Sequence, residues 1–252
     1  MICKAFRIAL TLVLSGFALS CAAWAATCSN ASLSGAYGFM HDGTDSNGDP
    51  YTAAVTQLTF DSTTGTFTGE TTASHDGVIA TEPVRGTYTV ASNCTGMGIP
   101  AGLSPFSIVV TSTGFLALHP FSEGFAVKQG SATCTNAGVK GSFGFATTGL
   151  FLAGAAPGWV AFIGELKFTV NPSGDGVISG NIAGAEGSTI LTFAEEPVTG
   201  SYSVERNCRG VATIKPEGLS AMHFHFVVVD GAKELLAVET DTNTVVSGTL
   251  QR

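Results

Sequence analysis

The chain repeats its own sequence, and that duplication constrains the fold more than any other feature. CSNASLSGAYGF, starting at Cys28, returns as CTNAGVKGSFGF at Cys134. EPVRGTYTVASNCTG, starting at Glu82, returns as EPVTGSYSVERNCRG at Glu196. This period is far longer than the roughly 20 to 50 residues of a solenoid repeat, so we expect each copy to be a domain with its own core.

The first copy is preceded by a segment with the layout of a secretory leader. Lys4 and Arg7 come first, an apolar run from Ile8 to about Leu19 follows, and Ala23-Trp24-Ala25 supplies an A-x-A cleavage site. The apolar run is too short to span a bilayer comfortably, and nothing like it recurs. We therefore expect a signal peptide over residues 1–25 and a secreted chain, periplasmic or extracellular, with no transmembrane segment.

A lipoprotein anchored through Cys21 is the alternative to simple secretion. It is disfavoured because Ala18 stands three residues before that cysteine, where a lipidation signal normally has a branched apolar residue.

Charge argues against two classes of partner. Removing the leader leaves nine basic against nineteen acidic residues, a net charge of about minus ten, and only 12% of all residues are charged. An acidic chain with so few Lys and Arg lacks the electrostatic attraction that nucleic acid or an anionic membrane requires. We expect no nucleic-acid partner.

Four cysteines remain after the leader, two in each copy. Four cysteines allow three pairings, but if each copy folds alone its own two must meet. The expected disulfides are therefore Cys28 with Cys94 and Cys134 with Cys208. Each would close a loop of roughly seventy residues, worth on the order of 4 kcal/mol by chain entropy. A metal-binding role is the weaker reading, since the chain has no CxxC motif and no matching histidine pair.

Apolar side chains in each copy alternate with a period of two, which predicts strands. In GTYTV, Tyr88 and Val90 share one face, and Tyr202 and Val204 repeat this in GSYSV. Such runs are joined by turn sequences typical of hairpins, for example Asp230-Gly231. Counting them gives about seven or eight strands per copy.

We predict an all-β chain of two tandem antiparallel β-barrels, each with one disulfide. The first barrel is expected over residues 26–131 and the second over 132–252, with a boundary near Ser131. A sandwich would accommodate the same strands. The barrel is preferred because closure removes the exposed edges that a Thr-rich, weakly charged sheet could not defend.

The two copies together resemble a family of exported bacterial proteins of unknown function. Those proteins carry a CxNxxLxGxYxF opening, a GTYTVxxxCTG middle and a VVSGT ending, and the match is strongest over the closing segment of the second copy. The resemblance implies a fold similar to the barrels of allene oxide cyclases and dirigent proteins, or more broadly to lipocalin-like barrels. Fold-level analogy transfers no active site.

A few side chains are candidate ligand-binding residues. Glu82 and Glu196 are the acids retained in both copies beside Pro-Val. A buried lone carboxylate can act as a base, but the position before a proline that leads into a strand favours a turn or strand-entry role. His223 and His225 share one strand face, opposite an apolar face retained in both copies, which favours a surface position over a metal site. Trp159 could rim a ligand pocket or pack between the barrels.

The acidic loop DGTDSNGDP, which starts at Asp42, superficially resembles a calcium loop. The EF-hand pattern fails, since Pro50 stands where Gly is required and Thr56 where a bidentate Glu is required. We expect a solvated hairpin loop, no metal and no cofactor.

Two functional hypotheses of different classes follow. The first is a non-enzymatic binding or structural module at the cell surface or outside, because no catalytic set recurs in both copies. The alternative is a small-molecule binder or cyclase-like isomerase that uses a barrel cavity for a small apolar ligand. A cavity with a few convergent polar groups would favour the second, whereas a matrix component would expose an apolar or Thr-rich patch to a surface partner.

Overall fold

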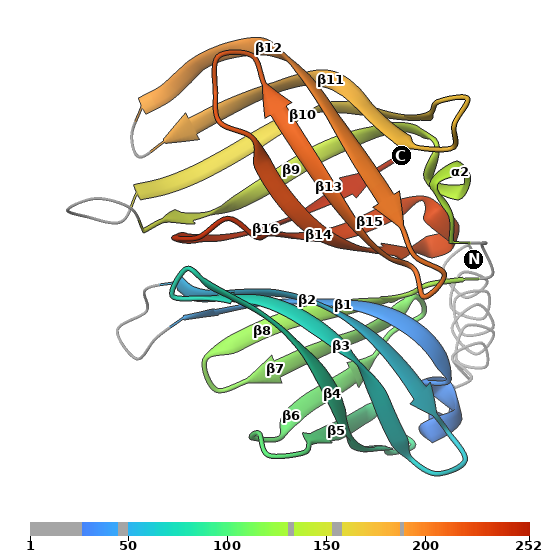
Figure 1. Cartoon of the computed structure of the whole chain (residues 1–252). Coiled ribbons are helices and arrows are strands. Elements are labelled where there is room, and N and C mark those ends of the chain that lie inside the picture. Colours follow the sequence, from blue (N-terminus) through green and yellow to red (C-terminus); the bar gives the residue numbers. More distant parts are fainter. Residues whose placement is uncertain (1–26, 45–49, 131–133, 153–157, 187–188) are drawn as a thin grey trace, which may run out of the picture.

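The computed structural model describes residues 27–44, 50–130, 134–152, 158–186 and 189–252. They form two closed antiparallel β-barrels of eight strands each, stacked one above the other (Figure 1). This confirms the predicted fold class. The predicted boundary near Ser131 lies at 131–133, outside the described residues.

The first barrel is a meander in which each strand pairs with the next and β8 closes on β1. Its strands are β1 (Gly35–Thr44), β2 (Pro50–Asp61), β3 (Thr66–His75), β4 (Val78–Val90), β5 (Thr95–Pro100), β6 (Phe106–Val110), β7 (Gly114–His119) and β8 (Ser122–Lys128).

The second barrel has the same topology, and β16 closes on β9. Its strands are β9 (Gly141–Phe151), β10 (Gly158–Val170), β11 (Gly176–Glu186), β12 (Thr189–Val204), β13 (Arg209–Pro216), β14 (Met222–Val229), β15 (Glu234–Glu239) and β16 (Thr244–Gln251). A short 3-10 turn, η2 (Asp230–Ala232), joins β14 to β15.

A short cap closes one end of the first barrel. The 3-10 turn η1 (Asn30–Ser32) is followed by Leu33, which is fully buried in the barrel core. The side-chain oxygen of Asn30 accepts a hydrogen bond from the backbone N–H of Val90, and the Tyr88 hydroxyl donates to the carbonyl oxygens of Asn30 and Leu33. The Cys28–Cys94 disulfide fastens the cap to the loop before β5.

The second barrel repeats these contacts with equivalent residues. Helix α2 (Asn136–Val139) buries Val139, Asn136 accepts from the N–H of Val204, and the Tyr202 hydroxyl donates to the Asn136 carbonyl. The Cys134–Cys208 disulfide fastens this cap. The sequence strings shared by the two copies thus supply many of the residues that hold each cap on the end of its barrel. Both predicted disulfides are confirmed.

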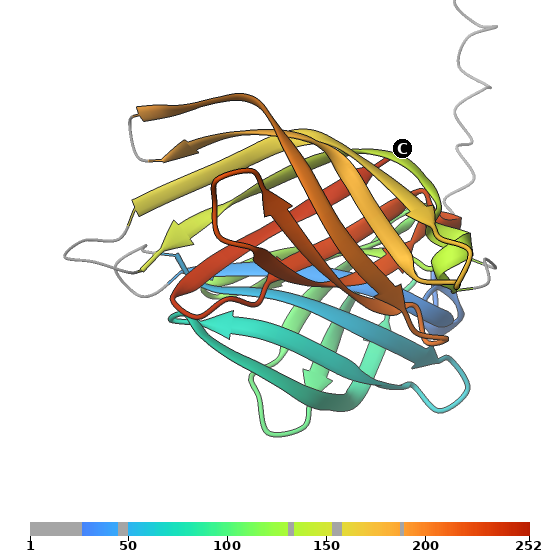
Figure 2. The ribbon, with the colours of Figure 1, turned by 45° about the horizontal axis from the view of Figure 1, so that its top comes forward.

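The barrels pack against each other through one buried apolar cluster. The strands β14 to β16 of the second barrel lie against β1 to β3 of the first (Figure 2). The backbones approach closely at Gly38, where an added Cβ would lie 2.5 Å from a methyl carbon of Val229 and 2.9 Å from one of Val227. The cluster comprises Met40, Ala53 and Val55 from the first barrel and Val227, Val229, Leu236, Val238 and Val245 from the second.

Polar contacts surround this cluster. Arg209 forms an ion pair with Glu70 and donates to the Thr72 hydroxyl at 3.0 Å. The Ser247 hydroxyl donates to Asp42 at 2.7 Å. A packed apolar centre with paired charges at its edge is the anatomy of a specific protein interface.

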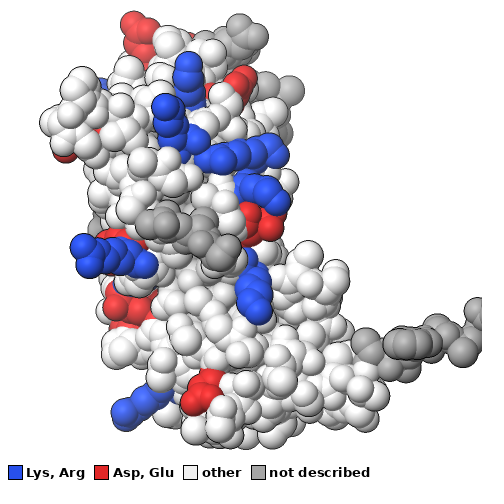
Figure 3. All heavy atoms as spheres, turned by 90° about the vertical axis from the view of Figure 1, so that its right-hand side faces the viewer, with Lys and Arg blue, Asp and Glu red and all other residues white. Residues whose placement is uncertain are grey.

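Charged side chains are unevenly distributed between the barrels. Arg85 and Lys128 are the only basic residues at positions 27–130, whereas positions 134–252 contain seven. On the side shown in Figure 3, Lys and Arg gather over the upper, second barrel, and the lower barrel is mostly uncharged surface. The first barrel therefore offers few basic side chains to an anionic partner.

Candidate functional site

The first barrel contains a cavity of about 390 Å³ in the half away from its cap. That volume lies within the roughly 300 to 1,000 Å³ of small-molecule sites. All eight strands of the first barrel contribute to its lining, and β5 does so through its last residue, Pro100. The lining residues are Phe39, His41, Gly43, Thr52, Thr56, Leu58, Phe67, Thr71, Val84, Pro100, Leu103, Ser104, Phe106, Ala117, His119, Ser122, Glu123 and Gly124.

Aromatic rings form the inner end of the cavity. Phe106 lies 6.3 Å from Phe39 and 6.4 Å from Phe67, measured between ring centroids. Behind them, Phe60 makes edge-on contacts with Tyr37 and Tyr88, and these rings fill the barrel down to the cap. The cavity is consequently apolar at its base.

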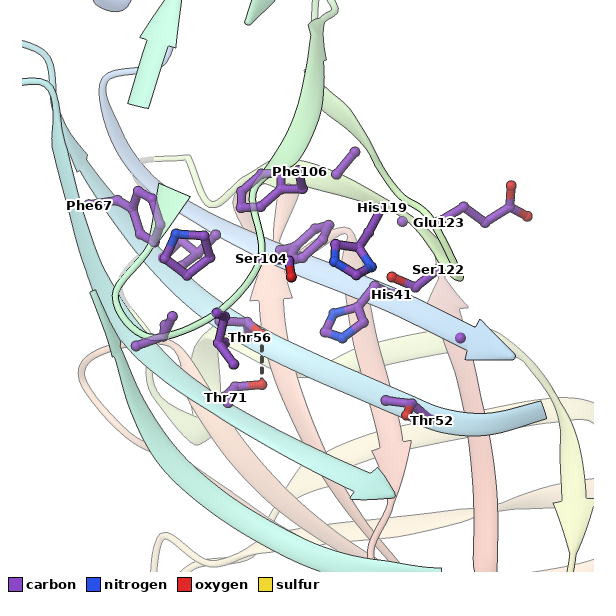
Figure 4. A pocket seen from close by; sticks show the side chains of 18 residues that line it. His41, Thr52, Thr56, Phe67, Thr71, Ser104, Phe106, His119, Ser122 and Glu123 are labelled. Carbon is purple, nitrogen blue, oxygen red and sulfur yellow. Dashed lines mark hydrogen bonds between the residues drawn. The ribbon is translucent and has the colours of Figure 1, made fainter. Parts of the chain in front are cut away.

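Two histidines lie together on the cavity wall (Figure 4). His41 comes from β1 and stacks on Phe39 at 5.2 Å, and His119 comes from the end of β7. Burial, together with the smaller effect of the nearby His119, lowers the pKa of His41 to about 4. The His41 imidazole is therefore neutral at physiological pH and offers one N–H donor and one acceptor nitrogen.

One polar atom in this wall has no hydrogen-bond partner among the described residues. It is the Nδ1 atom of His41, which is buried. Buried polar atoms are normally satisfied, so such an exception is a reason to look for a bound partner nearby.

Hydroxyl groups provide the remaining polar surface. Thr56 donates to Thr71 at 2.9 Å, and the Ser104 and Ser122 side chains lie near the two histidines (Figure 4). The Glu123 side chain points away from the cavity in the same view. The site therefore combines apolar walls with a few neutral polar groups.

The second barrel is packed where the first is hollow. The two barrels can be aligned through their strand pairing, in which Leu58 of β2 is equivalent to Leu166 of β10. In this alignment Phe162 is the counterpart of Ala54, and Ile182 is the counterpart of Thr71. Both larger side chains belong to the buried core of the second barrel. Met222, the first residue of β14, adds to the same core.

The second barrel instead buries a single carboxyl group. Glu239 occupies the inward position that His119 occupies in the first barrel, and its Oε2 atom has no partner among the described residues. Burial, together with the smaller effect of the nearby Asp241, raises its pKa to about 8. Asp241 also accepts from the backbone N–H of His223 and lies 2.7 Å from its Nδ1.

The two predicted glutamates lie outside the cavity. Glu82 is exposed on β4, where it pairs with the cavity-lining Thr71 but is not itself a lining residue. Glu196 is half-buried on β12 opposite Ile182 in the second barrel. The structure does not bring these two residues together, and a role for either stays a prediction.

The remaining predicted site residues lie on the outside of the second barrel. His223 is exposed, whereas His225 is half-buried against the first barrel, 2.9 Å from the Thr72 hydroxyl. Trp159 is 58% exposed on β10 and lies neither in the inter-barrel cluster nor on the cavity wall. Of the acidic loop, Asp42 contacts Ser247, while residues 45–49 lie outside the described residues.

Sequence reasoning missed the histidines that line the cavity. The signal was present, because His41 follows Tyr37 and Phe39 in the inward phase of β1, and His119 follows Phe115 and Ala117 in that of β7. Period-two alternation therefore places both histidines on the inward face of the barrel.

Comparisons with known proteins do not assign the chain to a family. No family model matches it, and no curated protein matches it. One solved structure, a protein of unknown function from the DUF3598 family of Nostoc punctiforme, is 9% identical over 88% of this chain and 97% of that chain, with a TM-score of 0.26. A likeness at this level carries no argument about function.

Two further observations bear on partners and location. Within the described ranges, no helix is long and apolar enough to cross a membrane, and no three His, Cys, Asp or Glu side chains are grouped as a metal site. The two disulfides indicate folding in an oxidising, non-cytoplasmic compartment.

Proposed function

We propose that this chain is an exported protein whose first barrel binds a small, largely apolar molecule and whose second barrel is a packed scaffold. The observation that carries the proposal is the cavity, which is hollow, aromatic at its base and edged with neutral polar groups. Apolar pockets with a few convergent polar groups are the usual form of small-molecule sites.

The wall chemistry limits the polar part of the ligand. With His41 neutral and Glu123 directed outward, the cavity offers no fixed charge from either side chain. A ligand with one hydroxyl or carbonyl group would hydrogen-bond to a histidine or to Ser122, while its hydrocarbon part contacts Leu58, Phe67 and Val84.

Export is the second element of the proposal. It is supported by the leader-like segment over residues 1–25 and by the two disulfides, and it places the protein in the periplasm or outside the cell. The resemblance to exported bacterial proteins of unknown function agrees with this location.

Binding is proposed in preference to an isomerase reaction that would use Glu82 or Glu196 as its general base. The carboxylates considered as general bases, Glu82 and Glu196, do not line the cavity. A general base must come within hydrogen-bond reach of the proton it removes, directly or through one water.

Two measurements test the binding function. Mass spectrometry of the protein purified from its native host, under native and then denaturing conditions, is expected to release an apolar molecule of a size that fits the cavity. Titration with Nile red, a neutral apolar fluorophore, is expected to show one saturable site, and Ala117→Phe is expected to weaken binding about tenfold or more by filling the cavity.

The matched control is Leu116→Phe, which adds a ring at the adjacent, outward position of the same strand. Equal binding by Ala117→Phe and the wild type would show that the dye binds elsewhere. An unfilled cavity in the native protein, with no saturable binding, would refute the proposed function.

A further inference from the structure

The surface that the second barrel contributes to the inter-barrel contact has an equivalent on the outside of the first barrel. The second barrel presents outward side chains of β14 to β16, which we call its inserting face. Because β6 and β7 pair as β14 and β15 do, the first barrel has an equivalent inserting face. Val227, Leu236, Val238 and Val245 correspond to Val109, Leu116, Leu118 and Phe121.

The two inserting faces differ in what covers them. The four side chains of the second barrel are at most 2% exposed, because the first barrel covers them. Their counterparts are 47%, 53%, 62% and 53% exposed, in the order Val109, Leu116, Leu118, Phe121. The neighbouring Met97 and Ile99 are also exposed. A contiguous apolar patch of this kind on a soluble barrel marks an interaction surface.

The opposite side of the contact is duplicated as well. The first barrel receives its neighbour on Met40, Ala53 and Val55, its receiving face. The same registers place Ala146, Ala161 and Ile163 at the equivalent positions of the second barrel. Ile163 is 62% exposed, and a groove on this face is lined by Gly144, Ala146 and Ile163.

Gly144 is the most specific of these correspondences. Its counterpart Gly38 must be glycine because Val227 and Val229 approach within 3 Å of where a Cβ would stand. At Gly144 an added Cβ would meet only the carbonyl oxygen of Gln251, at 3.7 Å. Within the described chain nothing requires glycine there, whereas an incoming inserting face would.

The polar pairs at the edge of the inter-barrel contact have compatible counterparts at the equivalent positions of the two exposed faces. The contact of Asp42 with Ser247 becomes Thr148 with Glu123, in which a hydroxyl again faces a carboxylate. The ion pair of Glu70 with Arg209 becomes Asn181 with Thr95, two neutral groups able to hydrogen-bond. Neither transferred pair brings like charges together.

We propose that copies of this chain associate head to tail, with the inserting face of one copy's first barrel seated on the receiving face of another copy's second barrel. The contact reuses the geometry that already joins the two barrels within one chain. Because the two faces differ, it is heterologous, and repetition gives a ring where the rotation closes and a filament where it does not. It lacks the covalent link of the internal contact, so association depends on concentration.

Sedimentation velocity of the mature chain over a wide concentration range tests the proposal. The sedimentation coefficient of the wild type is expected to rise with concentration, as dimers and then larger oligomers form. Leu116→Asp blocks the inserting face and Ile163→Asp blocks the receiving face, and each is expected to weaken association about tenfold or more, because a charge is buried without a partner. Leu219→Asp, in an exposed turn off both faces, is the matched control and is expected to associate as the wild type does.

Mixing the two blocked variants is the sharper test. Each retains one intact face, so a mixture is expected to form complexes of two chains and nothing larger, as only a heterologous contact allows. Leu118→Lys replaces Leu116→Asp should circular dichroism show that the latter fails to fold. A wild type that stays monomeric at every concentration, or a mixture that stays monomeric, overturns the proposal and leaves these faces to a different partner.

Discussion

The buried carboxyl group of Glu239 makes the stability of the protein depend on pH. Glu239 is 2% exposed inside the second barrel, and its pKa is raised to about 8 from an ordinary value of 4.5. The unfolded chain releases this proton near the ordinary value, whereas the native chain retains it up to about pH 8. Between those values the native state binds more protons, so the free energy of unfolding falls as the pH rises.

The magnitude follows from the pKa difference. Each pKa unit corresponds to about 1.4 kcal/mol, so Glu239 contributes a loss of at most about 5 kcal/mol between acidic and alkaline pH. The contribution is fully present below about pH 4.5 and is gone once the pH has passed about 8. Glu239→Gln removes the titration and retains a donor for Asp241, so the variant is expected to be more stable than the wild type at pH 9.

Urea unfolding at pH 5 and pH 9, followed by circular dichroism, measures the effect. The wild type is expected to lose several kcal/mol more than Glu239→Gln between the two pH values. Glu234→Gln removes a partly exposed carboxylate from the same strand and is expected to behave as the wild type does. Identical pH dependence in the wild type and Glu239→Gln would show that Glu239 is already ionised in the native barrel.

Three further predictions concern the caps and the contact between barrels. Replacing Cys28 and Cys94 by serine is expected to lower the free energy of unfolding by about 4 kcal/mol in urea, and no change would mean that the cap is held without the disulfide. Tyr88→Phe is expected to cost about 1 to 2 kcal/mol in the same assay, because the buried Leu33 carbonyl and the partly buried Asn30 carbonyl lose a donor; a variant as stable as the wild type would contradict this. Gly38→Ala is expected to lower Tm through a clash at the inter-barrel contact, and Gly144→Ala to leave the Tm of the dilute monomer unchanged; equal effects would refute the steric argument.

Much of the fold was predictable because local patterns and the duplication agree. The period-two alternation around Tyr88 and Tyr202 gave strands, and the recurrence of Cys28 and Cys94 as Cys134 and Cys208 selected one disulfide pairing from three. The strand number was less certain, because short strands such as β5 merge with turns in sequence. Barrel closure depends on pairing between the first and last strands, which no local pattern encodes.

The candidate site was harder to predict, because a cavity is defined by the side chains that fail to fill it. Thr71 and Ala54 are ordinary strand residues, and only their counterparts Ile182 and Phe162 show what volume is missing. Acids retained in both copies, a histidine pair and a tryptophan are the more conspicuous markers in the sequence, so the predicted site residues were Glu82, Glu196, His223, His225 and Trp159. His41 lies among aromatic residues in the sequence of β1 and is easily taken for part of the core.

The position of the caps also determines where the protein can be immobilised without obstructing the cavity. Both caps lie at the same end of the stacked barrels, and Arg252 reaches that end too, donating to the carbonyl oxygen of Lys140 beside the second cap (Figure 1). The cavity lies in the opposite half of the first barrel. A tether attached at residue 27 or at Arg252 would therefore lie at the end away from the cavity, so immobilisation through either point should preserve ligand uptake, while a bulky group at the lining residue Ser104 should block it.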